Sequence, residues 1–294
     1  MACELFSLIS PHWTNSTYAK VDHNELNIER LLGSGGFGSV YEGTYGSKKV
    51  AIKKLHQRGK NERAALDSFK AEVLAMSLLH HPNIVETVAI STASDCLHDY
   101  PLLIMELAGS RNLQEVLNDT DTEVIDVKRR LKFAHQIAMA LEYTHSFGIV
   151  HLDLKPANVL ITPEDNCKLA DFGCSQTVQE DGSCVNSPTR SYLTGTFAYT
   201  APELLRGCDP TTKADIYSFA ICLWQLIARE RPYGCENPHV VIFAVVAYNH
   251  RPPITTQMEM EEDYQHLVMQ GWNACPSDRP TAADCVEVLK KLQQ

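Results

Sequence analysis

Three polar side chains, Asp153, Asn158 and Asp171, stand at fixed spacing around two short apolar segments. These segments, Val159–Ile161 and Cys167–Ala170, are separated by a turn-forming stretch, so a hairpin is predicted. It would bring Asn158 and Asp171 to the same end. Hard cations take oxygen ligands such as Asn and Asp, and phosphoryl transfer also needs a carboxylate to orient and deprotonate a hydroxyl. The pattern predicts a phosphoryl-transfer site; the alternative is a chance pattern on a surface hairpin.

A glycine-rich segment lies near the beginning of the chain and reads Gly33-Ser34-Gly35-Gly36-Phe37-Gly38-Ser39-Val40. Glycines let a backbone turn sharply and approach phosphates without a Cβ in the way. The same spacing occurs in dinucleotide-binding folds, but there a helix opens at the glycines. Here a strand-like alternation over 40–45, a turn at Gly46-Ser47 and the segment Val50–Lys53 follow. This order favours a strand-and-loop lid over a nucleotide.

A lysine that contacts phosphates needs a carboxylate to hold it, and Lys53 has a candidate partner. Residues 66–79 show helical periodicity, and Glu72 lies on or beside the apolar face. Because a buried carboxylate without a partner is costly, we expect Glu72 to pair with Lys53. Glu62 and Asp67 are alternatives, but acids there are simply favourable near a helix start. The apolar face is formed by Phe69, Val73 and Met76. The simpler interpretation is that Lys53 and Glu72 are both solvated surface residues.

Together these segments resemble the eukaryotic protein kinases over about residues 25–292. Ala201-Pro202-Glu203 has the form that closes a kinase activation segment, and the resemblance implies an ion pair between Glu203 and Arg279. Asp215 opens an apolar helix over 216–228, where an acid must cap or pair.

The resemblance implies an α+β, bilobal protein-kinase fold, with a small β-rich lobe carrying one main helix and a larger helical lobe. We expect a short tail with little packing at residues 1–24 and a kinase domain over 25–294. Within it, the small lobe would span 25–104, the hinge 105–108 and the large lobe 109–294. A chain of 294 residues is long enough to bury two separate cores, one per lobe.

The resemblance also implies roles for single residues. Asp153 would be the base and Lys155 would steady the γ-phosphate of ATP, while Lys53 with Glu72 would hold the α- and β-phosphates. Asn158 and Asp171 would hold Mg²⁺. The residues expected around the nucleotide are Gly33, Ser34, Gly35, Gly36, Phe37, Gly38, Val40, Ala51, Lys53, Met105, Glu106, Leu107 and Leu160. Among these, Met105 is expected at the gatekeeper position and the Glu106 and Leu107 backbones facing adenine.

Charge and composition limit the partners and the compartment. The net charge of −10 argues against nucleic acid or an anionic membrane as the main partner. Ten cysteines without a C-x-x-C motif indicate reduced thiols, so we expect a cytoplasmic protein. The first residues make a poor secretory signal, and neither end carries a lipidation motif. The longest apolar runs are too short to span a bilayer.

Local strings narrow the resemblance to the Mos family of germ-cell serine/threonine kinases. They are HLDLKPAN at 151–158, DFGCS at 171–175, KADIYSFA at 213–220 and VVAY at 245–248. The family resemblance implies a MAP kinase kinase kinase that phosphorylates MAP kinase kinase in oocyte meiosis. Two residues depart from the general kinase pattern. Leu152 replaces the arginine that normally pairs with a phosphate on the activation loop, and Cys174 is either a reactive thiol or, more commonly, a buried inert one.

Two other functions stay open from the sequence. A pseudokinase would bind nucleotide or partners without turnover, but it would be signalled by loss of Lys53, Asp153, Asn158 or Asp171, and all are present. A soluble kinase of another family, tyrosine-specific or receptor-interacting-like, is the second. We further expect a monomer, and a polar activation loop over 174–194.

Overall fold

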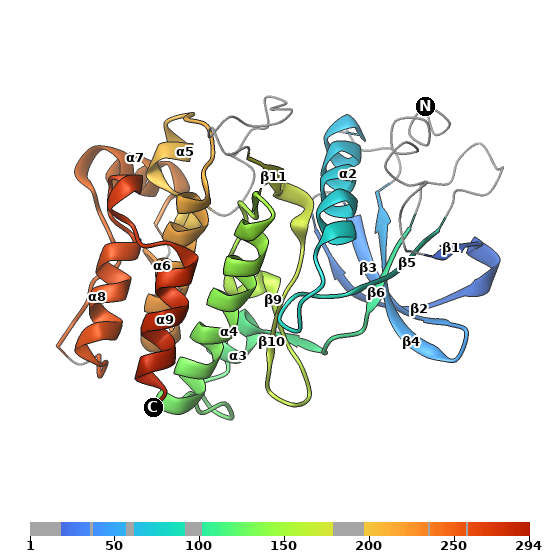
Figure 1. Ribbon diagram of the computed structural model, residues 1–294, viewed down its shortest axis with the longest axis horizontal. Helices are drawn as coiled ribbons and strands as arrows, with labels where there is room; N and C mark the ends of the chain where they lie inside the picture. Colours follow the sequence, from blue (N-terminus) through green and yellow to red (C-terminus); the bar gives the residue numbers. More distant parts are fainter. Residues whose placement is uncertain are drawn as a thin grey trace.

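The computed structural model describes residues 19–35, 38–56, 62–91, 102–178, 197–234, 236–256 and 258–294. Figure 1 shows a strand-rich part formed by the first third of the chain beside a larger helical part formed by the rest. The expected α+β, bilobal fold is therefore confirmed.

The strand-rich part contains one six-stranded sheet with the order β1-β5-β6-β4-β3-β2. Burial is uneven along its long antiparallel strands: β4 buries Val50, Ala51 and Ile52, whereas almost all of β2 is exposed. The strands are β1 (Ala19–Val21), β2 (Leu26–Ser34), β3 (Gly38–Tyr45), β4 (Lys48–Leu55), β5 (Thr87–Ser91) and β6 (Leu103–Glu106). β3 and β4 are joined by the predicted turn, where Gly46 has φ +57°.

One difference from expectation lies at the first strand. Residues 1–24 were expected to be a tail with little packing, but Ala19–Val21 pairs in parallel with β5 and Val21 is fully buried. The short 3₁₀ helix η1 (His23–Glu25), capped by Asp22, then turns the chain into β2. Val21 joins a small apolar cluster on one face of the sheet, and this burial accounts for the strand.

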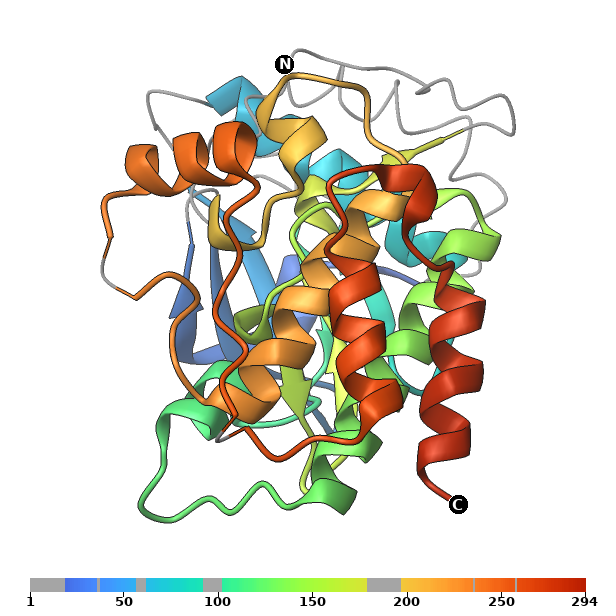
Figure 2. The ribbon, with the colours of Figure 1, turned by 90° about the vertical axis from the view of Figure 1, so that its left-hand side faces the viewer.

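Helix α2 (Glu62–Leu78) packs against the other face of the sheet, as both Figure 1 and Figure 2 show. Its predicted apolar face is buried, and the side chains of Phe69, Val73 and Met76 are each at most 3% exposed. The helix also contacts Phe172, so its core continues into the helical part. The expectation of two separate cores, one per lobe, is wrong for this reason: the larger apolar cluster is continuous between the two parts.

The helical part is built around α6 (Thr212–Ala228), a nearly continuous apolar segment that lies between the other helices. It begins four residues before the predicted helix at 216–228, so Asp215 lies in its first turn. The surrounding helices are α3 (Leu113–Asn118), α4 (Val127–Ser146), α5 (Pro202–Leu205), α7 (Pro238–Tyr248), α8 (Glu262–Gly271) and α9 (Ala282–Leu292). The short 3₁₀ turn η4 (Phe197–Tyr199) comes just before α5, and η5 (Pro276–Asp278) lies between α8 and α9.

Two small sheets lie where the two parts meet. β9 (Val159–Ile161) and β10 (Cys167–Leu169) form the predicted antiparallel hairpin, and β7 (Arg111–Asn112) adds a third strand to it. β8 (Ile149–Val150) pairs with β11 (Gln176–Thr177) on either side of the hairpin in sequence. The residues between β8 and β11 are thereby folded back on themselves, which gathers the predicted site residues in one place.

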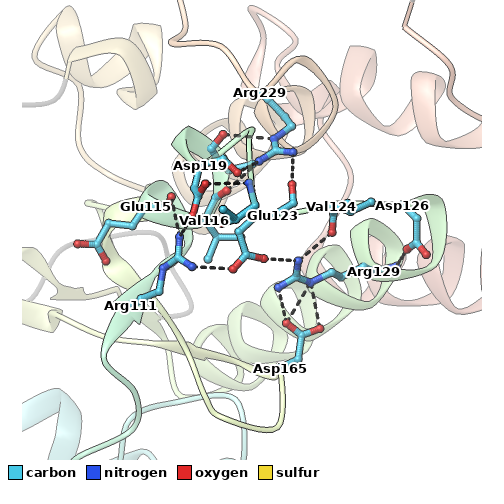
Figure 3. Close-up of polar contacts among 12 residues, drawn as sticks. Arg111, Glu115, Val116, Asp119, Glu123, Val124, Asp126, Arg129, Asp165 and Arg229 are labelled. Carbon is cyan, nitrogen blue, oxygen red and sulfur yellow. Dashed lines mark hydrogen bonds and ion pairs between the residues drawn. The ribbon is translucent and has the colours of Figure 1, made fainter.

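Three arginines hold the segment between β7 and α4 in place (Figure 3). Glu123 lies between Arg111 and Arg129, with N–O distances of 2.6 and 2.7 Å, and Arg129 also pairs with Asp165 in the turn of the hairpin. Arg229, at the end of α6, donates hydrogen bonds to four backbone carbonyls of the α3 segment and the loop after it. Those acceptors are the carbonyl groups of Val116, Leu117, Asp119 and Glu123.

Candidate active site

Asp153, Lys155 and Asn158 lie close together just before the first strand of the hairpin begins. The Lys155 ammonium donates to both Asp153 carboxylate oxygens, at 3.0 and 2.8 Å. The Asn158 amide donates to the Asp153 carbonyl at 2.8 Å and to its carboxylate at 2.9 Å. Asn158 ends the 3₁₀ turn η2 (Pro156–Asn158), and its own carbonyl accepts from the backbone N–H of Ala170, the residue before Asp171. The hairpin thus brings the chain at Asn158 and Asp171 together, as the spacing predicts.

Lys53 of β4 links two acids from distant parts of the chain. Its Nζ lies 2.6 Å from Glu72 Oε2 and 2.8 Å from Asp171 Oδ1. The expected Lys53–Glu72 pair is therefore present, and the surface interpretation of both residues is wrong: the side chains are 14% and 2% exposed. The Asp171 side chain is 47% exposed, so this carboxylate is accessible to solvent.

Burial and charge act on these three groups in different directions. Burial raises the pKa of Glu72 to about 7, although the Lys53 ammonium opposes this shift. The Lys53 charge lowers the pKa of Asp171 to about 2, against the effect of burial. Burial lowers the pKa of Lys53, but the two carboxylates outweigh it and leave the pKa raised. At neutral pH the site thus contains a protonated Lys53 and an ionised Asp171.

Asp215 of α6 holds the backbone next to Asp153 in place. This fully buried carboxylate accepts the backbone N–H groups of His151 and Leu152, each at 2.8 Å, and a side-chain hydrogen bond with His145 at 2.9 Å. The expectation that this acid must pair is therefore confirmed. Leu152 has φ +64°, a conformation that a residue with a Cβ rarely adopts, and the two accepted N–H groups hold it there.

The glycine-rich loop joins β2 to β3. The Gly35 N–H donates to the Gly38 carbonyl at 2.8 Å, which places Gly35 next to the first residue of β3. A Cβ at Gly38 would lie 2.6 Å from the Lys54 carbonyl of β4, so packing alone requires glycine there. A Cβ at Gly33 would meet nothing within 4 Å among the described residues, so packing gives no reason for that glycine. Gly36 and Phe37, also expected at the nucleotide, lie outside the described residues.

The remaining expected nucleotide contacts lie on facing elements. Ala51 of β4 pairs across the sheet with Met105 of β6, and both are 8% exposed. Val40, Leu107 and Leu160 are half-buried and pack on the main core. Glu106 is the last residue of β6, so the strand extends into the expected hinge at 105–108. Its carboxylate accepts from the Glu86 backbone at 2.8 Å and from Lys168 at 2.6 Å, a link that the sequence did not predict.

A second unpredicted contact joins helix α2 to the segment after Asp171. Ser68 donates from Oγ to the Gly173 carbonyl at 2.8 Å, and its side chain is buried. The one sequence signal for Ser68 is its spacing, one helical turn before Glu72. The expected Glu203–Arg279 pair is also present and buried, with two N–O distances of 2.6 and 2.7 Å.

The donor set suits a divalent cation held together with phosphates. Asn158 uses its amide N–H group for Asp153, so its amide oxygen is the atom suited to bind a cation, and Asp171 contributes an ionised, part-exposed carboxylate. Among the described residues no three His, Cys, Asp or Glu side chains form a metal-binding group. A small, hard cation needs no such cage, since it commonly binds one or two protein oxygens and completes its shell with phosphates and water.

Comparison with known proteins agrees with this geometry. The family described as "Protein kinase domain" matches residues 26–289. The chain is 48% identical to the serine/threonine-protein kinase mos of Patiria pectinifera over 282 residues, which cover 95% of this chain and 79% of that protein. It is 40% identical to the mos kinase of Xenopus laevis, covering 94% and 78%, and 39% identical to that of Sus scrofa, covering 94% and 83%.

The chain therefore belongs to the protein kinase family, whose members use ATP and a divalent metal. Within that family it is a serine/threonine kinase of the Mos type. Within the part of the chain that the structure describes, no helix is both long and apolar enough to cross a membrane.

Proposed function

We propose that the cluster around Lys53 and Asp153 is the catalytic centre, with roles divided as the motifs suggest. The observation that carries this proposal is the position of the Lys53 ammonium between Glu72 and Asp171, at 2.6 and 2.8 Å. A cation fixed in this way is suited to the α- and β-phosphates of ATP, and Glu72 prevents it from turning away. Asn158 and Asp171 bind Mg²⁺, which when bound neutralises charge on the phosphates.

Asp153 orients the hydroxyl of the substrate protein and accepts its proton on a carboxylate oxygen. Lys155 supports this step in two ways. Its ammonium keeps the Asp153 carboxylate in place at 2.8 Å, and its positive charge lies where the transferred γ-phosphate passes. The Asn158 amide contact with the same carboxylate fixes the base relative to the metal-binding oxygen.

The nucleotide is enclosed by residues of both parts of the molecule. The residues proposed to cover the phosphates are those of the glycine-rich segment, Gly33, Ser34, Gly35, Gly36, Phe37, Gly38 and Val40. The residues proposed to enclose the adenine are Ala51, Met105, Leu107 and Leu160. The backbones of Glu106 and Leu107 hydrogen-bond to its edge. The proposed division is a small lobe over 25–104, a hinge over 105–108 and a large lobe over 109–294.

We infer further that the substrate is MAP kinase kinase, and that the kinase acts as a monomer in the cytoplasm of oocytes, where it activates the MAP kinase cascade during meiosis. Membership in the Mos family supports this, as does a net charge of −10 that disfavours nucleic acid and anionic membranes. The Lys155-Pro156-Ala157-Asn158 string is also of the serine/threonine kinase type.

The direct test is incubation of the purified kinase with a catalytically dead MAP kinase kinase and ATP–Mg²⁺, followed by phosphoamino-acid analysis. We expect phosphoserine or phosphothreonine with the wild type and none with Asp153→Asn. Phosphotyrosine would favour the tyrosine-kinase alternative, and no transfer to any protein would favour the pseudokinase. Injection of the messenger into immature oocytes then tests the pathway: wild type should raise doubly phosphorylated MAP kinase above the level given by Asp153→Asn.

A further inference from the structure

Helix α2 contacts the segment 171–173 at two points on one face. The first passes through Lys53, which joins Glu72 of the helix to the Asp171 carboxylate. The second is direct: the Ser68 hydroxyl donates to the Gly173 carbonyl at 2.8 Å. Ser68 and Glu72 are four residues apart, so they lie one above the other on the helix. The two contacts therefore hold the segment on both sides of Phe172.

The Ser68 contact differs from the usual behaviour of a serine in a helix. Such a hydroxyl commonly bonds to a carbonyl of its own helix, and Ser77 of the same helix does so, donating to the Leu74 carbonyl at 2.7 Å. Ser68 is 6% exposed and donates to another element instead. Removing the hydroxyl would leave the helix intact. It would also break the buried hydrogen bond to the Gly173 carbonyl, and this loss lowers the free energy of unfolding.

Packing at Gly173 shows how close this approach is. A Cβ added to Gly173 would lie 2.5 Å from Ser68 Oγ and 3.3 Å from Asp171 Oδ1. Glycine at this position thus leaves room for the hydroxyl and the carboxylate, which both lie close to the place a Cβ would occupy. Asp171 itself has φ +62°, an unfavourable conformation for a residue with a side chain, so neighbouring contacts must hold it.

We propose that Ser68 is a positioning residue for phosphoryl transfer. By holding the Gly173 carbonyl, it keeps Asp171 in the conformation in which its carboxylate reaches Lys53 and faces the metal, and it makes the position of α2 depend on that of Asp171. This inference rests on the proposed role of Asp171 as a metal ligand. Ser68 touches neither nucleotide nor substrate, and it acts through the backbone of residues 171–173.

The test compares Ser68→Ala with Ser77→Ala in the full chain, so that each variant loses one serine hydroxyl of the same helix. For Ser68→Ala we expect kcat to fall about tenfold, as the loss of one buried hydrogen bond made in the active arrangement would give. We expect the free Mg²⁺ concentration for half-maximal activity to rise severalfold, and KM for the protein substrate to stay unchanged. Ser77→Ala should match wild type in all three values.

A readout without nucleotide separates positioning from general destabilisation. Hydrogen–deuterium exchange should be faster at the amides of 171–175 in Ser68→Ala than in Ser77→Ala, with exchange in α6 the same in both variants. Wild-type kcat, Mg²⁺ dependence and exchange in Ser68→Ala would overturn the proposal, as would a uniform rise in exchange over the whole domain. Asp171→Asn tests the underlying role separately: if it keeps normal Mg²⁺-dependent turnover, the metal-ligand assignment fails first, whereas an inactive Asp171→Asn beside an unaffected Ser68→Ala refutes only the role of Ser68.

Discussion

The Asp215 carboxylate accepts the backbone N–H of Leu152 at 2.8 Å and so holds this residue at φ +64°. Kinases usually have arginine at this position, and its side chain pairs with a phosphate that is attached to the activation loop. Here the backbone is fixed by a buried acid, while the side chain is apolar and packs partly on the core. The backbone next to Asp153 is therefore held by Asp215.

We predict that activity does not require phosphorylation of the activation loop, because no catalytic-loop arginine is present to bind the phosphate. Phosphatase treatment, or combined alanine substitution of the loop hydroxyls, should leave kcat within about twofold of wild type, the range of a change that removes no transition-state contact. Loss of activity after either treatment would contradict this. The hydroxyls are Ser183, Ser187, Thr189, Ser191 and Thr194, which lie outside the described residues.

Lys53→Met, Asp153→Asn and Asp171→Asn should each abolish phosphoryl transfer with the fold intact. Each removes a charged group that is placed for the phosphates, the hydroxyl or the metal, and such a loss costs on the order of 10² or more in turnover. Circular dichroism and Tm check the fold, and transfer of labelled phosphate measures activity. An Asp171→Asn enzyme with near-normal turnover at ordinary Mg²⁺ concentration would show that the metal assignment is wrong.

The pH dependence should reflect Glu72, because burial raises its pKa from 4.5 to about 7. An unfolded glutamate releases its proton near pH 4.5, so the folded state binds more protons between these values. The contribution of Glu72 to the free energy of unfolding is thus complete below pH 4.5 and is lost as the pH rises through about 7. Activity should change in the opposite direction, rising with pH through about 7 as the ionised Glu72 pairs with Lys53.

Glu72→Gln provides the comparison for this prediction. Denaturant unfolding of both proteins between pH 5 and 8 should show the wild type losing stability relative to Glu72→Gln as the pH rises. An unchanging difference between them over this range would refute the raised pKa.

Arg229→Met should lower the free energy of unfolding by about 3 kcal/mol, because it leaves several backbone carbonyls without the charged donor that now serves them (Figure 3). Arg206→Met is the matched control. That exposed arginine donates to one carbonyl, of Val246, and its loss should cost less than about 1 kcal/mol. Urea unfolding measures both, and equal effects would count against the special role of Arg229.

The sequence predicted the elements whose cause is local. The β9–β10 hairpin follows from apolar strands around a turn, and the buried face of α2 follows from its periodicity. The Lys53–Glu72 pair was predictable because a carboxylate beside an apolar face needs a partner. Glu203–Arg279 rested on family resemblance alone, since nothing local joins residues so far apart.

Contacts set by tertiary packing were not predictable in this way. The Ser68–Gly173 bond and the Lys168–Glu106 pair join segments whose relative position only the folded chain defines. The continuous core depends on α2 and Phe172 packing together across the two parts. Strand β1 was missed because three residues carry too little periodicity to indicate a strand.

That first strand has a consequence for where a recombinant fragment of this kinase can begin. A fragment starting at Leu26, near the beginning of the family match, would lack Val21 and leave β5 as the edge of the sheet. An uncovered strand edge can pair with the same edge of another molecule. Such a fragment should therefore self-associate on a sizing column at concentrations where a protein beginning before Ala19 does not.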